Sequence, residues 1–114
     1  MVTPAEAAQR QLDAYNARDV DAFLAAYTAD CTVRSFPAGT LLMEGRAAMR
    51  DRYATQFADH PDLHCELVHR VEHESFVIDH EHVTGLREDE VVHAVAMYEV
   101  RNGLIANVWF VRED

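Results

Sequence analysis

Hydrophobic residues recur at helical spacing near the start of the chain. The stretch TPAE at residues 3–6 has the form of a capping box with proline at the first helical position, so a helix is predicted to begin there. Ala8, Leu12 and Tyr15 then fall at i, i+4 and i+7, and this apolar stripe ends near Asn16. The pattern predicts one amphipathic helix.

Two further helices are predicted before the middle of the chain. Asp19 can cap a short second helix. A longer third helix is predicted after Gly45, and Pro61 prevents it from continuing past about His60. The apolar positions of these helices are Val20, Phe23, Leu24 and Tyr27 in the second, and Met49, Tyr53 and Phe57 in the third.

Strand patterns separate these helices and fill the second half. The segment CTVRSF predicts a strand that ends in the turn Pro37-Ala38-Gly39. The dipeptide Asn102-Gly103 suits a type I′ hairpin turn. Helix, helix, strand, helix and four antiparallel strands form an α+β order, in which a strongly curved sheet would wrap around the long helix. Period-two alternation places the last four strands at 63–72, 76–84, 91–101 and 104–112.

Composition and charge narrow the functional classes. A chain of 114 residues with 49% hydrophobic residues can form one globular domain, predicted to span residues 1–114. A net charge of −10 repels phosphates and anionic lipids, so we expect no nucleic-acid partner and no membrane partner. Cys31 and Cys65 lie in strand-like runs and fit small buried hydrophobes in a reducing compartment, although a disulfide between them stays possible. With no signal-peptide pattern at the start, we expect a cytoplasmic protein.

Three stretches carry a resemblance to a known superfamily. They are YNARDVDAFLAAYTADCTVRSF, GRAAMRDRYA and YEVRNGLIANVWF. In these stretches and in its order of elements, the chain resembles the nuclear transport factor 2-like superfamily, in its SnoaL-like and ketosteroid-isomerase-like branch. The resemblance implies a cone-shaped fold with a pocket at its open end. This superfamily includes isomerases, cyclases, dehydratases, epoxide hydrolases and non-catalytic binding modules, so the fold alone does not define the function.

The positions of the ketosteroid isomerase triad do not carry its residues here. The resemblance places the general base, the oxyanion-binding tyrosine and the protonated acid at positions where this chain has no acid and no tyrosine. Only Tyr53 matches a tyrosine that supports that site. We therefore expect no isomerase that uses this triad. The corresponding positions are Ser35 or Phe36, Gln11, and Ala96 or Met97.

The hairpin around residues 72–75 brings acids, histidines and an arginine together. A hairpin without a bulge gives the same register whether its loop has two or four residues. The resemblance, through Gly85 and the stretch DLHCELVHR, implies that one face of this hairpin looks into the cone. His80 and His82 would then point outward. The inward face would carry His64, Glu66, Val68 and Arg70 against Val83, Glu81, Asp79 and Val77.

That inward face is the candidate catalytic centre. Glu66 directly opposite Glu81 should repel it, so one of the two carboxyl groups is expected to hold a proton near neutral pH. Arg70 would lie diagonal to Asp79, and His64 lies two residues from Glu66. A neutralising pair beside an acid of raised pKa is how acid–base sites are built.

Aromatic and polar residues could complete a substrate pocket. Two simpler interpretations stay open: the charged residues form a solvated sheet face, or a structural ion network without chemistry. The predicted substrate-binding residues are Tyr53 from the third helix and Tyr98, Asn107 and Trp109, which share a face in the Asn-Gly register.

Histidines offer a possible metal site. His80 and His82 share a face, with His69 nearby, in a spacing that Zn²⁺ could use. The chain has no HExxH or CxxC pattern, and histidines on an acidic surface are commonly solvated. We therefore expect neither a metal nor another cofactor.

The last hairpin predicts a partner. Its strands are apolar on both faces, and a sheet with two apolar faces must cover both. Helices can cover the concave face, and a second copy of the chain can cover the other, so we expect a homodimer through the sheet. The expected function is proton-transfer or water-assisted chemistry (isomerase, cyclase, dehydratase or hydrolase type) on an apolar small-molecule metabolite. The alternative is a non-catalytic dimer that binds a ligand or serves as an accessory module.

Overall fold

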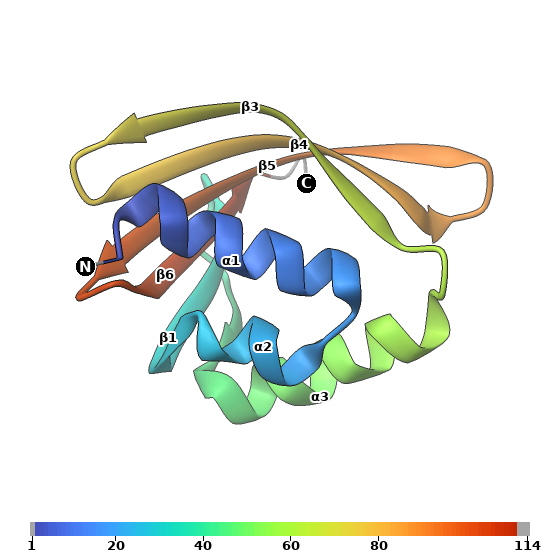
Figure 1. Ribbon diagram of the computed structural model, residues 1–114, viewed down its shortest axis with the longest axis horizontal. Coiled ribbons are helices and arrows are strands. Elements are labelled where there is room, and N and C mark those ends of the chain that lie inside the picture. Colours follow the sequence, from blue (N-terminus) through green and yellow to red (C-terminus); the bar gives the residue numbers. More distant parts are fainter. Residues whose placement is uncertain (1, 112–114) are drawn as a thin grey trace.

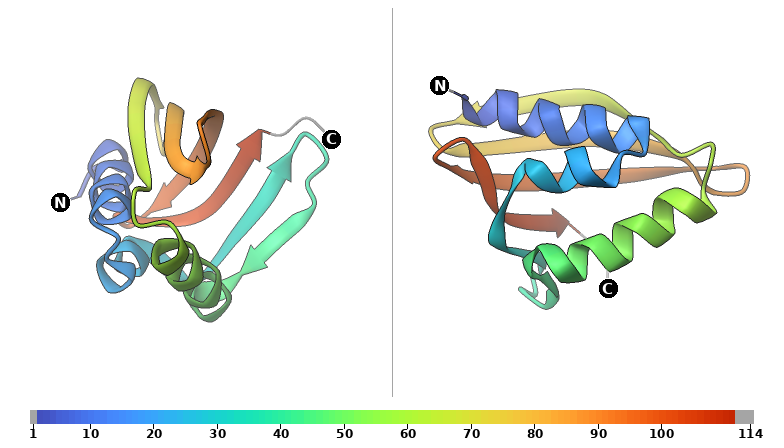
Figure 2. Two further views of the ribbon diagram at one scale, coloured as in Figure 1. Left: turned by 90° about the vertical axis from the view of Figure 1, so that its right-hand side faces the viewer. Right: turned by 60° about the horizontal axis from the view of Figure 1, so that its bottom comes forward.

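Three helices pack against the concave face of a curved six-stranded sheet (Figures 1 and 2). The computed structural model describes residues 2–111. The fold class predicted from the sequence is confirmed. The helices are α1 (Pro4–Ala17), α2 (Val20–Ala25) and α3 (Gly45–Asp59), and the strands are β1 (Tyr27–Phe36), β2 (Leu41–Glu44), β3 (His64–His73), β4 (Phe76–Arg87), β5 (Glu90–Arg101) and β6 (Leu104–Val111).

The helix starts follow the predicted capping residues. The Thr3 hydroxyl accepts from the Glu6 backbone N–H at 3.1 Å, and the Glu6 carboxylate accepts from the Thr3 N–H at 3.2 Å. The Asp19 carboxylate caps α2 by accepting from the Ala22 N–H at 3.1 Å. These caps satisfy backbone donors that a helix leaves unpaired. They fix where α1 and α2 begin, and so how the two helices cover the sheet.

The sheet has the strand order β2-β1-β6-β5-β4-β3. β1 runs parallel to β6, and the other pairs are antiparallel, so the sheet is mixed. β2 was not predicted, and β1 begins at Tyr27 rather than at residue 31. The turn at Asn102-Gly103 is confirmed, with φ angles of 53° and 79°. Residue 112, at the predicted end of the last strand, lies outside the described residues.

A bulge in β3 changes the predicted register of the first hairpin. His73 pairs with Phe76, Leu67 pairs with Glu81, and the register shifts by one residue before His69. Two residues of β3 therefore oppose one of β4, which reverses the side-chain alternation of β3 at Val68. The register expected from the sequence is wrong along the whole of β3. Arg70 pairs with Asp79 rather than Val77, which keeps Arg70 on its predicted face. Glu66 pairs with His82 rather than Glu81, which reverses the face of Glu66.

A second bulge lies in the last hairpin. Val100 pairs with Ile105, but Glu99 pairs with Asn107, so the register shifts at this point. Tyr98 then pairs with Val108 instead of Asn107. Residues of β6 beyond the shift lie on the face opposite to the one predicted.

Aromatic packing joins the helices under the sheet. Tyr15, Phe23, Tyr53 and Phe57 have ring centroids between 4.6 and 6.5 Å apart. Such offset and edge-to-face pairs add to the stabilisation from burial. This cluster holds α1, α2 and α3 together and forms one wall of the interior.

Gly85 allows the α3–β3 connection to approach β4. Its φ is +76°, and an added Cβ would lie 2.2 Å from the backbone oxygen of Asp62. Only glycine fits this conformation and this distance. This close approach places the part of β4 around Gly85 next to the connection that follows α3.

Both cysteines are buried and free, as expected for small hydrophobes. Within residues 2–111, no helix has the length and apolar character needed to span a membrane. The cytoplasmic location stays a prediction.

Candidate functional site

A cavity of about 980 Å³ lies between the helices and the concave face of the sheet. Polar residues of the helices and of the sheet line it, and they include Tyr15 on α1, Tyr53 and Gln56 on α3, Glu81 on β4 and Tyr98 on β5. Apolar side chains share the cavity wall with converging polar groups, a combination found in small-molecule sites. The apolar wall includes Leu12, Phe23, Met43, Val83, Val92 and Phe110.

Glu81 is the titratable group that distinguishes this cavity. It is 6% exposed. Burial raises the pKa of Glu81 to about 7, and the nearby charge of Asp79 adds to the increase. A hydrogen bond with the Cys65 thiol and the charge of Arg70 act in the opposite direction. Glu81 can therefore gain or lose a proton near neutral pH.

Asp79 and Arg70 form an ion pair beside Glu81. Asp79 is 0% exposed. Arg70 donates from Nε to Oδ1 at 2.7 Å and from Nη2 to Oδ2 at 3.0 Å, and Nη1 donates to Gln9 Oε1 on α1 at 3.0 Å. The hydrogen bonds to Asp79 raise the pKa of Arg70. Because both carboxylate oxygens of Asp79 are engaged, this pair fixes β3, β4 and α1 relative to Glu81.

Two predicted catalytic residues face away from the cavity. Glu66 and His64 are exposed, and Glu66 pairs with His82 rather than with Glu81. The bulge in β3 causes this difference, because it reverses the alternation between these residues and Arg70. The pKa of Glu81 is therefore raised by burial and by Asp79, not by an opposing Glu66.

Two predicted pocket residues also lie on the outer face. Asn107 pairs with Glu99, and Trp109 with Met97, so neither shares a face with Tyr98. Asn107 donates to Glu99 Oε1 at 2.8 Å and accepts from the Thr32 hydroxyl at 2.6 Å. The bulge in β6 places Asn107 and Trp109 on this outer face. The predicted positions of Tyr53 and Tyr98 in the cavity agree with the structure.

The sequence did not identify several polar residues of the cavity. Gln11 donates to the Tyr98 hydroxyl at 3.1 Å and accepts from the Tyr27 hydroxyl at 3.4 Å. Gln56 donates to the Tyr15 hydroxyl at 2.9 Å. Burial raises the pKa of all three of these tyrosines, so their hydroxyl groups stay protonated near neutral pH. Tyr15 was read only as part of a helix stripe, and a buried glutamine has no signal in sequence spacing.

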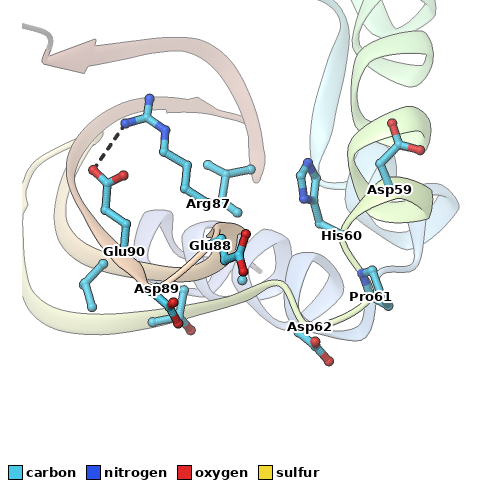
Figure 3. Close-up of a pocket in the computed structure, with 12 residues that line it drawn as sticks. Asp59, His60, Pro61, Asp62, Arg87, Glu88, Asp89 and Glu90 are labelled. Carbon is cyan, nitrogen blue, oxygen red and sulfur yellow. Dashed lines mark hydrogen bonds and ion pairs between the residues drawn. The ribbon is translucent and has the colours of Figure 1, made fainter.

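A second hollow lies where the α3–β3 connection meets the tip of the β4–β5 hairpin (Figure 3). Its volume is about 630 Å³. Arg87 and Glu90 interact across the hairpin at 3.4 Å. The hollow holds none of the predicted site residues, and its acids are exposed to water, so the interior cavity is the better candidate. These acids are Asp59, Asp62, Glu88, Asp89 and Glu90.

The outer histidines form a different group from the one expected. His80 and His82 point outward, as predicted, but the third member is His93 on β5 instead of His69 on β3. The direct pairing of His82 with His93 was not visible before the β4–β5 register was known.

Helices that cover the concave face of a curved mixed sheet, with a pocket between the two layers, define a cone-shaped α+β domain of the nuclear transport factor 2-like class. The model of the SnoaL-like domain family matches residues 8–108. The chain belongs to the SnoaL-like domain family.

Solved structures of proteins from several organisms share this fold. An uncharacterised cystatin-fold protein from Novosphingobium aromaticivorans is 29% identical, with a TM-score of 0.88 over 98% of this chain and 100% of its own. A proposed ketosteroid isomerase from Kribbella flavida is 19% identical, with a TM-score of 0.80 over 97% and 78% of the two chains. A proposed polyketide cyclase from Sinorhizobium meliloti is 16% identical, with a TM-score of 0.78 over 92% and 93%. A search of curated proteins found no match.

Proposed function

We propose that this domain is an enzyme that moves a proton on a small apolar metabolite, with Glu81 as the acid–base group. The observation that carries the proposal is a buried carboxyl group, with a pKa of about 7, that lines a large cavity. A general acid or base works best when its pKa lies near the working pH. The structural neighbours described as a proposed isomerase and a proposed cyclase fit the same broad class of reaction.

The geometry supplies the other parts of a proton transfer. As a carboxylate, Glu81 accepts a proton from a carbon next to a carbonyl group, or from a water molecule. Tyr15 and Tyr98 each accept a hydrogen bond from a glutamine and still have their own hydroxyl hydrogen to donate. A hydroxyl that donates to the substrate oxygen stabilises the negative charge that develops there. In this proposal Asp79 and Arg70 are positioning residues, while Glu66 and His64 have no part.

A non-catalytic ligand-binding module is the second candidate. It is favoured by the hydrogen bonds that link polar side chains of the cavity to one another. Gln11 connects Tyr98 with Tyr27, and Gln56 contacts Tyr15. Such pairing rigidifies a pocket that only has to bind. The two candidates differ in whether Glu81 exchanges a proton with a bound molecule.

The test uses base-catalysed ring opening of a nitrobenzisoxazole, an apolar compound that reports a buried carboxylate base without the natural substrate. The carboxylate takes the ring C–H proton while the N–O bond breaks, which gives a coloured phenolate. The wild-type rate should rise with pH through about 7, and Glu81→Gln should lower it at least about 100-fold. The exposed Glu66→Gln variant should keep the wild-type rate. Equal rates for wild type and Glu81→Gln would refute the proposal, and binding without turnover would favour the binding module.

We also propose that the convex face of the sheet binds a second copy of the chain. Val71, Phe76 and Ile78 are between 36 and 47% exposed on this face, and Met97 and Trp109 lie partly buried in the same sheet surface. A contiguous apolar surface of this kind typically marks a protein interface. A two-fold dimer lets the same face cover itself.

A further inference from the structure

Three histidines meet on the sheet face opposite to the side chains of Asp79 and Glu81, and two of them, His80 and His93, lie at positions that also border the cavity. β4 alternates without interruption, so inward Asp79 and Glu81 require outward His80 and His82. On the adjacent strand, His93 is the direct partner of His82. Two histidines at i and i+2 on one strand, with a third opposite one of them, bring three imidazole rings to one spot.

The distances suit a shared ligand. One ring nitrogen from each histidine lies within 4.8 Å of the others. The ring centroids of His82 and His93 are 4.4 Å apart, and those of His80 and His82 are 5.4 Å apart. A tetrahedral zinc ion with Zn–N bonds of about 2.1 Å needs nitrogens about 3.4 Å apart. His80 and His93 are exposed and His82 is half-buried, so small side-chain rotations can close this difference.

We propose that His80, His82 and His93 bind one divalent transition-metal ion, with zinc as the natural occupant. Neutral imidazole is a preferred ligand of zinc, copper and nickel, whereas magnesium and calcium require oxygen ligands. The net charge of −10 favours the approach of a cation. Three protein ligands leave a fourth position for water. The sequence suggested solvated surface histidines, because it does not show that residues of two strands converge here.

Neighbouring groups on the same face come from β3. Glu66 is the Cα partner of His82, and His69 is the partner of His80. Glu66 adds negative charge beside the three rings. Because a proton and a metal compete for the same imidazole nitrogen, zinc affinity should be lower in acidic solution.

The experiment is a zinc titration of protein without a histidine tag, in competition with a coloured chelator. We expect one zinc ion per chain at pH 7.5, with a Kd below about 10 µM. His82→Ala and His93→Ala should each weaken binding at least tenfold, about 1.4 kcal/mol. The matched control is His73→Ala, which removes an exposed histidine of β3 whose partner is Phe76, and it should bind zinc like the wild type.

The spectrum of bound cobalt gives a second measurement. Cobalt in place of zinc should show the visible bands of a four-coordinate site with nitrogen ligands, and these bands should disappear in His93→Ala. The substituted side chains are exposed or half-buried, so thermal unfolding should match the wild type and exclude misfolding. The proposal is overturned if the wild type fails to bind zinc in this range, if His82→Ala binds it as tightly, or if His73→Ala loses as much affinity.

Discussion

Glu81→Gln isolates the effect of burying a carboxyl group in the cavity. Glutamine has nearly the same shape but carries no charge at any pH. In the wild type, burial raises the pKa of Glu81 from 4.5 to about 7, so between these pH values the folded protein holds a proton that the unfolded chain has released. The contribution of this proton to stability is fully present below pH 4.5 and is lost as the pH rises through about 7.

The size of the effect follows from the pKa difference. Each pKa unit corresponds to about 1.4 kcal/mol, so the rise from 4.5 to about 7 costs the wild type about 3 kcal/mol of unfolding free energy across this window. The side chain is only 6% exposed, so screening by water reduces this value little. The variant has no such loss. Its stability relative to the wild type should therefore increase by about 3 kcal/mol between pH 4.5 and pH 8.

Urea unfolding of both proteins at the two pH values measures this difference. Trp109, which is half-buried, provides a fluorescence signal, and circular dichroism checks that the transition is two-state. Glu66→Gln is the control, because the exposed Glu66 faces away from the cavity, and it should change stability by less than about 0.5 kcal/mol at either pH. An effect of Glu81→Gln that is equal at both pH values would refute the reasoning.

Three further predictions concern the ion pair, a glycine and the dimer. Arg70→Met leaves the buried Asp79 without its partner and should lower the unfolding free energy by about 3 kcal/mol in urea; a loss below about 1 kcal/mol would show that water reaches the carboxylate. Gly85→Ala should cost about 3 kcal/mol or more through its clash with backbone. Gly39→Ala, with a similar φ and open space around it, should cost only about 1 kcal/mol, and equal melting temperatures for these two variants would contradict the clash. Wild type should sediment as a dimer at about 10 µM and Ile78→Asp as a monomer, and a monomeric wild type would exclude the convex interface.

Local chemistry made much of the fold predictable. The capping residues Thr3 and Asp19 act on backbone groups within three residues of themselves, and Asn102-Gly103 determines its own turn through two positive φ angles. Their effects do not depend on distant parts of the chain. The short strand Leu41–Glu44 was missed because four residues next to turns give too little alternation to separate a strand from a loop.

The candidate site was predictable only in part, because register depends on bulges. The bulges in β3 and β6 carry no glycine that would mark them in the sequence. His64 and Trp109 were placed on the wrong face for this reason. Asp79 and Glu81 were placed correctly because β4 alternates without interruption from Phe76 to Thr84.

The regular alternation of β4 also explains how one short strand can serve two different purposes. A strand sends successive side chains to opposite faces, so each outward histidine of the sequence DHEH follows an inward acid. On the inward face, burial raises the pKa of Glu81 to about 7. On the outward face His80 and His93 are exposed in the single chain, so their imidazole rings can bind a metal ion at little cost in desolvation. In the two proposals, the backbone of β4 thus separates the acid–base group from the metal ligands by the thickness of a single sheet.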